Sequence, residues 1–300
     1  MNSTPAITII MPVYNREKTL PKALESISAQ SDKDFEVVLV DNNSTDGSKA
    51  LMEEWAAAQP FKVRVVEERK QGASAARARG ADVATTEWLR FFDSDDELVP
   101  DHVARLRKAI AEHPDAELIG WDIAMHYSPQ DIRRGVFKID DIAFGNLMHG
   151  YLATERYAVT GRLYRRAGGW NTEVGVWDDI ELGARLIEQN PKMVKIEGVL
   201  MVHNYVQADS LTQNEKASKI AILDRALNRM AETLGPDRAH WIDLKRMIVA
   251  ALSPGADGKA LRDRILSEAK SHRTLLRIAY AYTSRGGRGT ARILRRLRLI

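Results

Sequence analysis

Along the first 95 residues, stretches with the hydrophobic pattern of strands alternate with stretches that have the pattern of helices. Four short apolar runs rich in β-branched and aromatic residues predict strands at Ile7–Val13, Phe35–Val40, Val63–Glu67 and Trp88–Phe92. Between these runs the apolar residues return at helical spacing, as they do at Leu20, Leu24 and Ile27. Strands joined by helical crossovers predict an α/β fold, with a mostly parallel, Rossmann-like sheet covered by helices on both faces.

The rest of the chain is less regular. The same patterns predict helices at Pro100–His113 and from Asp178, and strands at Leu118–Tyr127, Ala158–Tyr164 and Val199–Val206. Beyond Thr212 the pattern is helical to the end, with a break at Ser253–Gly258. We expect Thr19 to cap the first helix, and Asp46 or Ser44 to cap the second.

Polar residues follow three of the predicted strands. They are Asn15, then Asp41-Asn42-Asn43, then the acids from Asp93 to Asp96. In open α/β sheets the carboxyl ends of the strands meet at one edge, and ligands bind outside that edge. The sequence therefore predicts a ligand site there, although DNNSTDGS is also compatible with a plain turn and helix cap.

The stretch FFDSDDELVP places four acids within five positions. Like charges this close repel one another, so a cation or water must compensate them. Carboxylate oxygens suit a hard divalent cation such as Mg²⁺ or Mn²⁺ bound together with substrate phosphates. The alternative is a set of acids before a helix N-terminus, where the helix dipole favours them. An EF-hand is disfavoured because its glycine and spaced oxygens are missing.

Composition narrows the class of protein. The 300 residues are 44% hydrophobic and 28% charged, which is typical of globular chains. The absence of cysteine excludes disulfides, zinc-thiolate sites and cysteine nucleophiles. The N-terminus resembles no signal peptide, and no apolar run approaches the roughly 20 residues of a membrane span. We therefore expect a soluble, cytoplasmic protein.

The net charge of +3 hides an asymmetry. The tail Arg285–Ile300 holds six arginines and no acid, which leaves a net charge of −3 on the preceding residues. On a helix, ARILRRLRLI is basic and amphipathic, which suits the inner face of an anionic membrane. A solvated terminus is the competing interpretation. Nucleic acid also attracts such charge, but we do not expect it as a partner.

Five segments in this order resemble family 2 glycosyltransferases of the GT-A fold. They are IIMPVYN, DNNSTDGS, QGASAARARG, FFDSDDE and VWDDIELGARL, and the resemblance runs from about Thr8 to Leu211. It implies a GT-A domain over residues 1–212, with a nucleotide-binding half at 1–100 and an acceptor-binding half at 101–212. Residues 213–300 would then be a helical C-terminal extension that includes the basic tail.

The resemblance implies inverting transfer of a sugar from a nucleotide-diphosphate donor, usually linked to UDP. The acceptor would be a hydroxyl of a glycan or of a lipid-linked molecule. Asp179 would be the general base, and Asp95 and His203 would hold Mn²⁺ or Mg²⁺. Apart from the resemblance, we expect Trp177 to stack on an acceptor sugar with Asp178 beside it, although a place in the core is the alternative for Trp177. The residues that would bind the donor are Pro12, Tyr14, Asn15, Asp41, Asn43, Arg77, Asp93 and Ser94.

Two features depart from the family pattern. Asp178 stands where the family usually has Glu, and the Asn of its "A-R-N-x-G" segment is missing beside Arg79. The Q-x-x-R-W motif and membrane spans of the processive synthases are absent, so we do not expect a membrane-embedded polymerase.

Two other functions are compatible with parts of the pattern. A nucleotidyltransferase that makes nucleotide sugars usually carries a glycine-rich loop after the first strand, where this chain reads PVYNREKTL. A non-catalytic nucleotide- or glycan-binding module would not need Asp179. Without the resemblance, Asp178, Asp179 and Glu181 are also compatible with ordinary first-turn acids of a helix.

Overall fold

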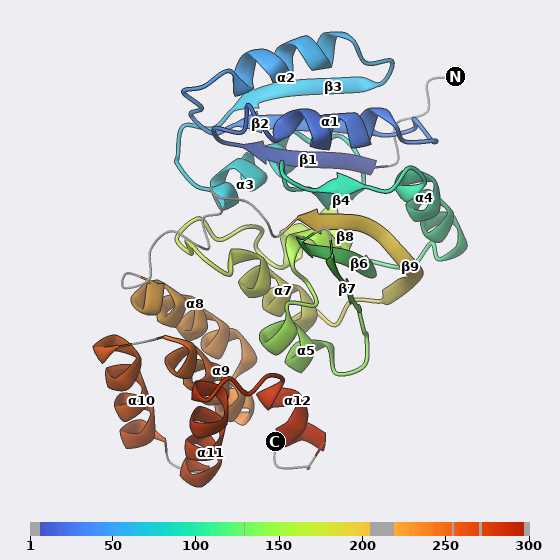
Figure 1. Cartoon of the computed structure of the whole chain (residues 1–300). Coiled ribbons are helices and arrows are strands. Elements are labelled where there is room, and N and C mark those ends of the chain that lie inside the picture. The colour runs from blue at the N-terminus through green and yellow to red at the C-terminus, as the bar shows by residue number, and fades with distance from the viewer. Residues whose placement is uncertain (1–6, 129, 205–218, 254, 270–271, 297–300) are drawn as a thin grey trace.

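The structure is a computed structural model, and it describes residues 7–128, 130–204, 219–253, 255–269 and 272–296 (Figure 1). Its strands are β1 (Ile7–Val13), β2 (Glu36–Asp41), β3 (Lys62–Glu67), β4 (Trp88–Phe91), β5 (Glu97–Leu98), β6 (Leu118–Ser128), β7 (Asp131–Gly135), β8 (Tyr157–Thr160) and β9 (Met193–Asn204). Its first helices are α1 (Leu20–Ser28), α2 (Ser48–Ala57), α3 (Ala73–Val83), α4 (His102–Glu112), α5 (Ile142–His149), α6 (Gly161–Arg166) and α7 (Asp178–Glu188). The later helices are α8 (Lys219–Leu234), α9 (Ala239–Leu252), α10 (Ala256–Glu268), α11 (Arg273–Ser284) and α12 (Thr290–Arg296), with 3-10 turns η1 (Thr154–Arg156) and η2 (Pro236–Arg238).

All of the strands join one nine-stranded sheet. Its order is β3-β2-β1-β4-β8-β6-β9-β5, with β7 paired to β6. The four N-terminal strands pair in parallel, whereas β8, β5 and β7 are antiparallel to their neighbours. The predicted α/β class and parallel N-terminal half are therefore confirmed, and the sheet is mixed beyond β4.

Both faces of the sheet carry apolar residues, and helices cover each face. One core joins the sheet to α1, α2 and α4, for example through Leu24, Met52 and Leu106. The other joins it to α3, α6 and α7, for example through Ala76 and Leu182. Because strands such as β2 are buried along their whole length, they read as continuous apolar runs.

The C-terminal helices pack against α5 and α7 (Figure 1). Leu147 and Ile180 share a core with Leu227 and Met230 of α8, and Phe144 joins a second core formed by α9 to α12. No helix in the described residues is long and apolar enough to cross a bilayer. The predicted break at Ser253–Gly258 falls between α9 and α10.

Several local predictions were wrong. The strand expected at Ala158–Tyr164 ends at Thr160, because the Thr160 hydroxyl accepts a hydrogen bond from the Leu163 amide and begins α6. Thr19 occupies the N-cap of α1 but makes no capping hydrogen bond. Gly47 directly precedes α2, but the Asp46 carboxylate accepts a hydrogen bond from the Ser48 amide at 3.0 Å, so the predicted cap by Asp46 is confirmed. The last strand starts earlier than predicted, at Met193, and residues 205 and 206 lie outside the described residues.

Helix α3 lies close to the sheet because Gly80 faces it. A Cβ atom at Gly80 would lie 2.3 Å from Ile10 Cγ2 and 3.2 Å from Val40 Cγ2. The helix carries Arg77 on the same buried side, one turn earlier. The missing side chain at Gly80 therefore sets the distance between Arg77 and the strand ends.

Replacing Gly80 by Val should push α3 away from β1 and β2. We expect Gly80→Val to lose about 1–3 kcal/mol of unfolding free energy, as overpacked cores do. Urea unfolding would measure it. Ala57→Val, at the exposed end of α2, is the matched control and should change stability by no more than about 0.5 kcal/mol. Equal midpoints for the two variants would contradict the close approach.

Candidate active site

The loops after β1 and β2 are bound to each other. The Thr45 amide donates to Asn15 Oδ1 at 2.8 Å, and the Asn15 amide donates to Ser44 Oγ at 3.2 Å. Asp41, at the buried end of β2, accepts from the Ser44 amide at 3.3 Å. The structure therefore brings Asn15 and Asp41 together, as the topology predicts.

Asn42 and Asn43 connect the same edge to the loop after β3. Asn42 Nδ2 donates to the carbonyls of Glu68 and Lys70 at 2.8 Å each, and its Oδ1 accepts from the Gly72 amide at 2.7 Å. Asn43 adopts a left-handed φ of 64° and donates to the Arg69 carbonyl. These contacts fix the start of α3, the helix that carries Arg77.

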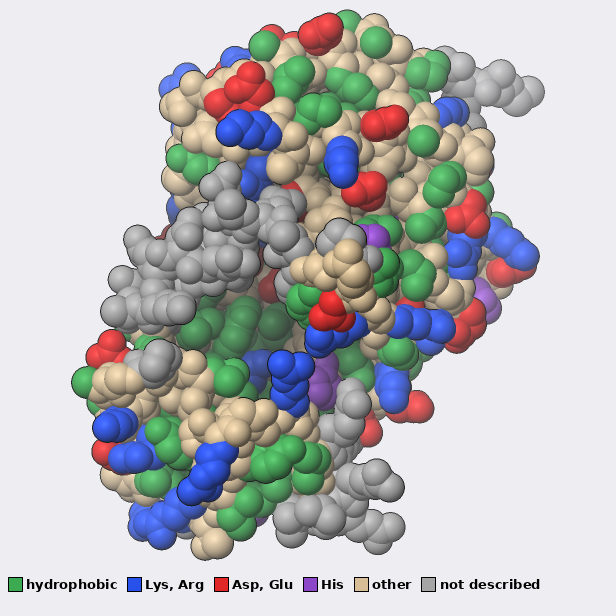
Figure 2. Space-filling model, in the orientation of Figure 1, with side chains coloured by type: hydrophobic (Ala, Val, Ile, Leu, Met, Phe, Trp, Pro, Cys, Tyr) green, Lys and Arg blue, Asp and Glu red, His purple; other side chains and the backbone are tan. Residues whose placement is uncertain are grey.

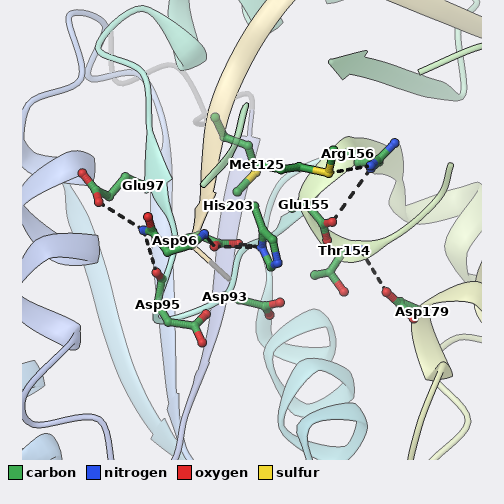
Figure 3. A network of polar contacts seen from close by, with 12 residues as sticks. Asp93, Asp95, Asp96, Glu97, Met125, Thr154, Glu155, Arg156, Asp179 and His203 are labelled. Carbon is green, nitrogen blue, oxygen red and sulfur yellow. Dashed lines mark hydrogen bonds and ion pairs between the residues drawn. The ribbon is translucent and has the colours of Figure 1, made fainter. Parts of the chain in front are cut away.

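The acidic loop after β4 directs its carboxylates to three different cations. Asp93 pairs with Arg77 at 2.7 Å, Asp95 lies 3.9 Å from Arg16, and Asp96 lies 3.0 Å from His203. Figure 3 shows Asp95 and Asp96 to the left of His203 and Asp179 to its right, with Asp96 in contact with the His203 ring. Each side chain has a separate positive neighbour, which explains how so many acids stand in one loop.

Arg77 links this loop to the start of α7. Its guanidinium is buried and lies 2.7 Å from Asp93 Oδ1, 3.0 Å from Asp178 Oδ2 and 4.8 Å from the centre of the Trp170 ring. Burial opposes its charge, but Asp93 and Asp178 outweigh burial and raise the pKa of Arg77. Ser74 Oγ adds a second donor to Asp178, at 2.5 Å.

Asp179 lies beside this bridge but has no cation of its own within salt-bridge distance among the described residues. The amide of Ile180 donates to its Oδ1 at 2.8 Å, and the amide of Thr154 lies 3.4 Å from its Oδ2. Burial, the charge of Asp178 and the charge of Glu155 together raise the pKa of Asp179 to about 7. Its side chain remains partly open to solvent.

Asp96 and His203 form a recessed pair behind the acidic loop (Figure 3). Burial would lower the pKa of His203, but the hydrogen bond and charge of Asp96 raise it to about 10. Burial raises the pKa of Asp96 to about 7, against the opposing effect of His203. The Asn204 amide also donates to Asp96, at 3.1 Å, so that the end of β9 is held to the loop.

The remaining sequence-predicted residues lie around this network. Pro12 pairs with Val40 inside the sheet, and Tyr14 is 44% exposed at the end of β1. Ser94 is buried within the acidic loop. Trp177 lies further out, at the N-cap of α7, between the two C-terminal cores.

Sequence reasoning missed three charged residues of the site. Arg16 faces Asp95, and its place directly after Asn15 was a usable signal. Glu155 contributes its charge to both Asp179 and His203. Arg90 is fully buried under the loop and donates to the carbonyls of Thr154 and Glu155 at 2.9 and 3.4 Å. No motif marks the last two residues, because their neighbours come from distant parts of the chain.

The carboxylate oxygens of the acidic loop fit a divalent cation whose remaining coordination positions are filled by oxygens of a bound substrate. In the described residues, no group of three or more His, Asp and Glu is arranged to hold a metal alone. Burial and the charge of Asp93 raise the pKa of Asp95, so a cation beside Asp95 would relieve the repulsion. One or two carboxylates completed by phosphate oxygens is a common environment for Mg²⁺.

A parallel half-sheet with this acidic loop at its edge, followed by a mixed half, is the architecture of a GT-A-type glycosyltransferase. A model of the family described as "Glycosyl transferase family 2" matches residues 8–167. A protein of Mycobacterium bovis (strain BCG / Pasteur 1173P2), named "PGL/p-HBAD biosynthesis glycosyltransferase", is 31% identical over 212 residues, 70% of this chain and 80% of its own. The chain belongs to glycosyl transferase family 2.

Solved structures share the fold along nearly the whole chain. Residues 1–349 of Staphylococcus aureus TarS in complex with UDP-GlcNAc match with a TM-score of 0.64 and 16% identity, covering 97% of this chain and 92% of that one. The mannosyltransferase PcManGT of Pyrobaculum calidifontis, in complex with GDP-Man and Mn²⁺, matches with a TM-score of 0.59 and 21% identity, covering 94% and 88%. At these identities the likeness establishes the GT-A fold.

Asp179 should cost the folded protein stability above neutral pH. Its folded pKa of about 7 exceeds the roughly 3.9 of an unfolded Asp, so the folded state binds the extra proton and stability falls as pH rises between these values. We expect Asp179→Asn to gain on the order of a few kcal/mol at pH 8 and well below about 1 kcal/mol at pH 4, near the pKa of the unfolded chain. Urea unfolding at both pH values would measure this.

The neighbouring acid supplies a control of opposite sign. Asp178→Asn removes a carboxylate that pairs with Arg77 and should therefore lose stability at pH 8. If both variants changed stability in the same direction at pH 8, the electrostatic account of Asp179 would be wrong.

Proposed function

We propose that this protein transfers a sugar from a UDP-sugar to a hydroxyl of a glycan or lipid-linked acceptor, with inversion and with Asp179 as general base. The observation that carries the proposal is the Arg77 bridge, which joins Asp93 of the acidic loop to Asp178 beside the base. Family membership favours this reaction over nucleotidyl transfer or simple binding.

The donor half of the site would consist of residues from the three strand ends. Asp41, Asn15 and the neighbouring Pro12, Tyr14 and Asn43 would surround the nucleotide. Nitrogen donors of Arg77, now paired with Asp93, would reach diphosphate oxygens next to Ser94. The bound UDP-GlcNAc and GDP-Man of the structural relatives support a nucleotide-sugar donor.

A divalent cation, Mn²⁺ or Mg²⁺, would be held by Asp95 and His203, with His203 giving up the proton that Asp96 stabilises when no ion is bound. A hydrogen bond to Asp96 orients the imidazole through Nδ1, as carboxylates do behind metal-binding histidines. When bound, such an ion supplies Lewis-acid stabilisation for the charge that develops on the leaving diphosphate. The Mn²⁺ in the PcManGT complex supports this cofactor.

Asp179 is suited to take the proton of the acceptor hydroxyl. Inversion requires the base on the face opposite the leaving group, and Asp179 comes from a different element than the acidic loop. A general base with a pKa near the working pH combines basicity with the correct protonation state. Glu155 and Asp178 would maintain that pKa through their charge.

We assign donor binding to residues 1–100 and acceptor binding mainly to residues 101–212, with the helical part from 213 onwards beside them. The tail Arg285–Ile300 would contact an anionic membrane surface if the acceptor is lipid-linked. Within it, Leu294 is buried in the helical core and Ile293 is 40% exposed, while residues 297–300 lie outside the described residues. Flotation with anionic liposomes, with and without the tail, tests this contact.

Donor identity can be tested by thermal shift with UDP-, GDP- and dTDP-sugars, each with and without Mn²⁺. Binding to the folded state should raise stability by about 2.7 kcal/mol at a hundredfold excess over Kd, so the UDP-sugar with Mn²⁺ should give the largest shift. Asp95→Ala should lose the part that depends on Mn²⁺, whereas Glu112→Gln, on the exposed end of α4, should keep it. No shift with any nucleotide sugar would refute the donor assignment.

The role of Asp179 as base can be tested by following UDP release from the preferred donor. Asp179→Asn should keep the donor-induced thermal shift but lower turnover by on the order of 10²–10⁴, the usual contribution of a general base. The wild-type rate should fall on the acid side with an inflection near pH 7, because protonated Asp179 cannot accept a proton. Unchanged turnover in Asp179→Asn would refute Asp179 as the base, whereas donor binding without any UDP release by the wild type would favour a binding module.

A further inference from the structure

A lysine from the C-terminal helices lies against the ring of Trp177, the N-cap residue of α7. Lys245 of α9 places its Nζ 4.7 Å from the centre of the Trp177 ring and 3.4 Å from the carbonyl oxygen of Met148, near the end of α5. Trp177 directly precedes Asp178 and Asp179. The ammonium group therefore stands at the junction of α5, α7 and α9, against the first turn of the helix that carries Asp178 and Asp179.

The charge of Lys245 is not matched by an acid within the described part of the chain. Burial alone acts on its pKa, which falls to about 8, and no carboxylate contributes to that shift. Arg77, in contrast, is paired with Asp93 and Asp178. An ammonium group surrounded by protein but still partly open to solvent is a position where an anion from solution would be stabilised.

Trp177 supplies a second, independent sign of a site. It adopts a left-handed φ of 53°, which is uncommon for a bulky residue and costs on the order of 1–3 kcal/mol. Its ring is only partly buried although it touches both C-terminal cores. Such strained positions cluster at ligand sites, where the surrounding structure maintains them.

The surroundings of this junction are apolar. Figure 2 shows a hollow between the sheet-bearing part and the C-terminal helices, lined mostly by hydrophobic side chains, with Lys or Arg side chains at its lower edge. Met148, Leu223 and Trp241 are partly buried hydrophobic residues of the same cores. A ligand that combines an apolar segment with one anionic group would match both properties.

We propose that Lys245 and Trp177 form an acceptor subsite that recognises a negatively charged oxygen group, a phosphate or carboxylate, attached to an apolar segment of the acceptor. The proposal rests on the proposed function, since it assigns this group to the acceptor. The anionic group is an anchor and does not react.

Binding of simple amphiphiles would test the subsite without requiring turnover. The probes are octyl phosphate, nonanoate and uncharged octyl glucoside, each below its micelle concentration and measured by calorimetry. Wild type and Lys245→Arg should bind the anionic probes, and Lys245→Met should weaken them by about tenfold or more, as expected for a lost charged hydrogen bond. The stronger of the two anionic probes identifies the preferred group.

Matched controls separate charge from packing. Lys259→Met removes an exposed lysine of α10 in the same helical part and should leave all binding unchanged. Octyl glucoside should bind wild type and Lys245→Met equally. Equal binding of the anionic probes to wild type and Lys245→Met, or an equal loss of all three probes in Lys245→Met, would overturn the subsite.

A measurement on the wild type covers the case in which Lys245→Met does not fold. Acetylation of Lys245 at pH 8, followed by mass spectrometry, should slow severalfold with octyl phosphate but not with octyl glucoside, while Lys259 is unaffected. Equal acetylation rates would overturn the proposal. The UDP-sugar thermal shift reports separately on the proposed function, so a protein that binds octyl phosphate through Lys245 but no nucleotide sugar would refute only the latter.

Discussion

The buried guanidinium of Arg77 is the contact on which the rest of the site depends. It compensates Asp93 in the loop after β4 and Asp178 at the start of α7, at 2.7 and 3.0 Å. Without it, two carboxylates would stand close together in a recess, where charge is poorly screened. The small residues of α3 and the close approach at Gly80 bring the arginine to that point.

The same site keeps three further carboxylates whose charge is opposed by burial. The pKa values of Asp95, Asp96 and Asp179 are all raised, chiefly by burial, so the folded chain maintains these groups against its own stability. Active sites often keep groups that lower the stability of the fold, because those groups are needed for function. A cation at the acidic loop and a proton from the acceptor would each relieve part of this repulsion.

Much of the fold and part of the site could be predicted from local patterns. The runs that became β1, β2 and β4 are apolar on both faces, and the acids at Asp93 to Asp96 follow directly from the end of β4. The helix after Thr160 was missed because a hydroxyl cap overrides a β-rich run. Glu155 and Arg90 were missed because their role comes from tertiary packing, which joins segments 65 residues apart in sequence.

Arg90 of β4 shows how tertiary packing connects the parallel part of the sheet to the segment around Thr154 and Glu155. It lies under the acidic loop, where burial lowers its pKa to about 10 while the charges of Asp93 and Asp96 oppose that shift. Its hydrogen bonds hold the carbonyls of Thr154 and Glu155, and the Thr154 amide reaches Asp179. The position of Asp179, the proposed base, is thereby tied to the strand that ends in the acidic loop. The C-terminal helices reach the same helix α7 from another side, because Lys245 of α9 packs on Trp177. The start of α7 is therefore held both by the sheet-bearing part and by the helical extension.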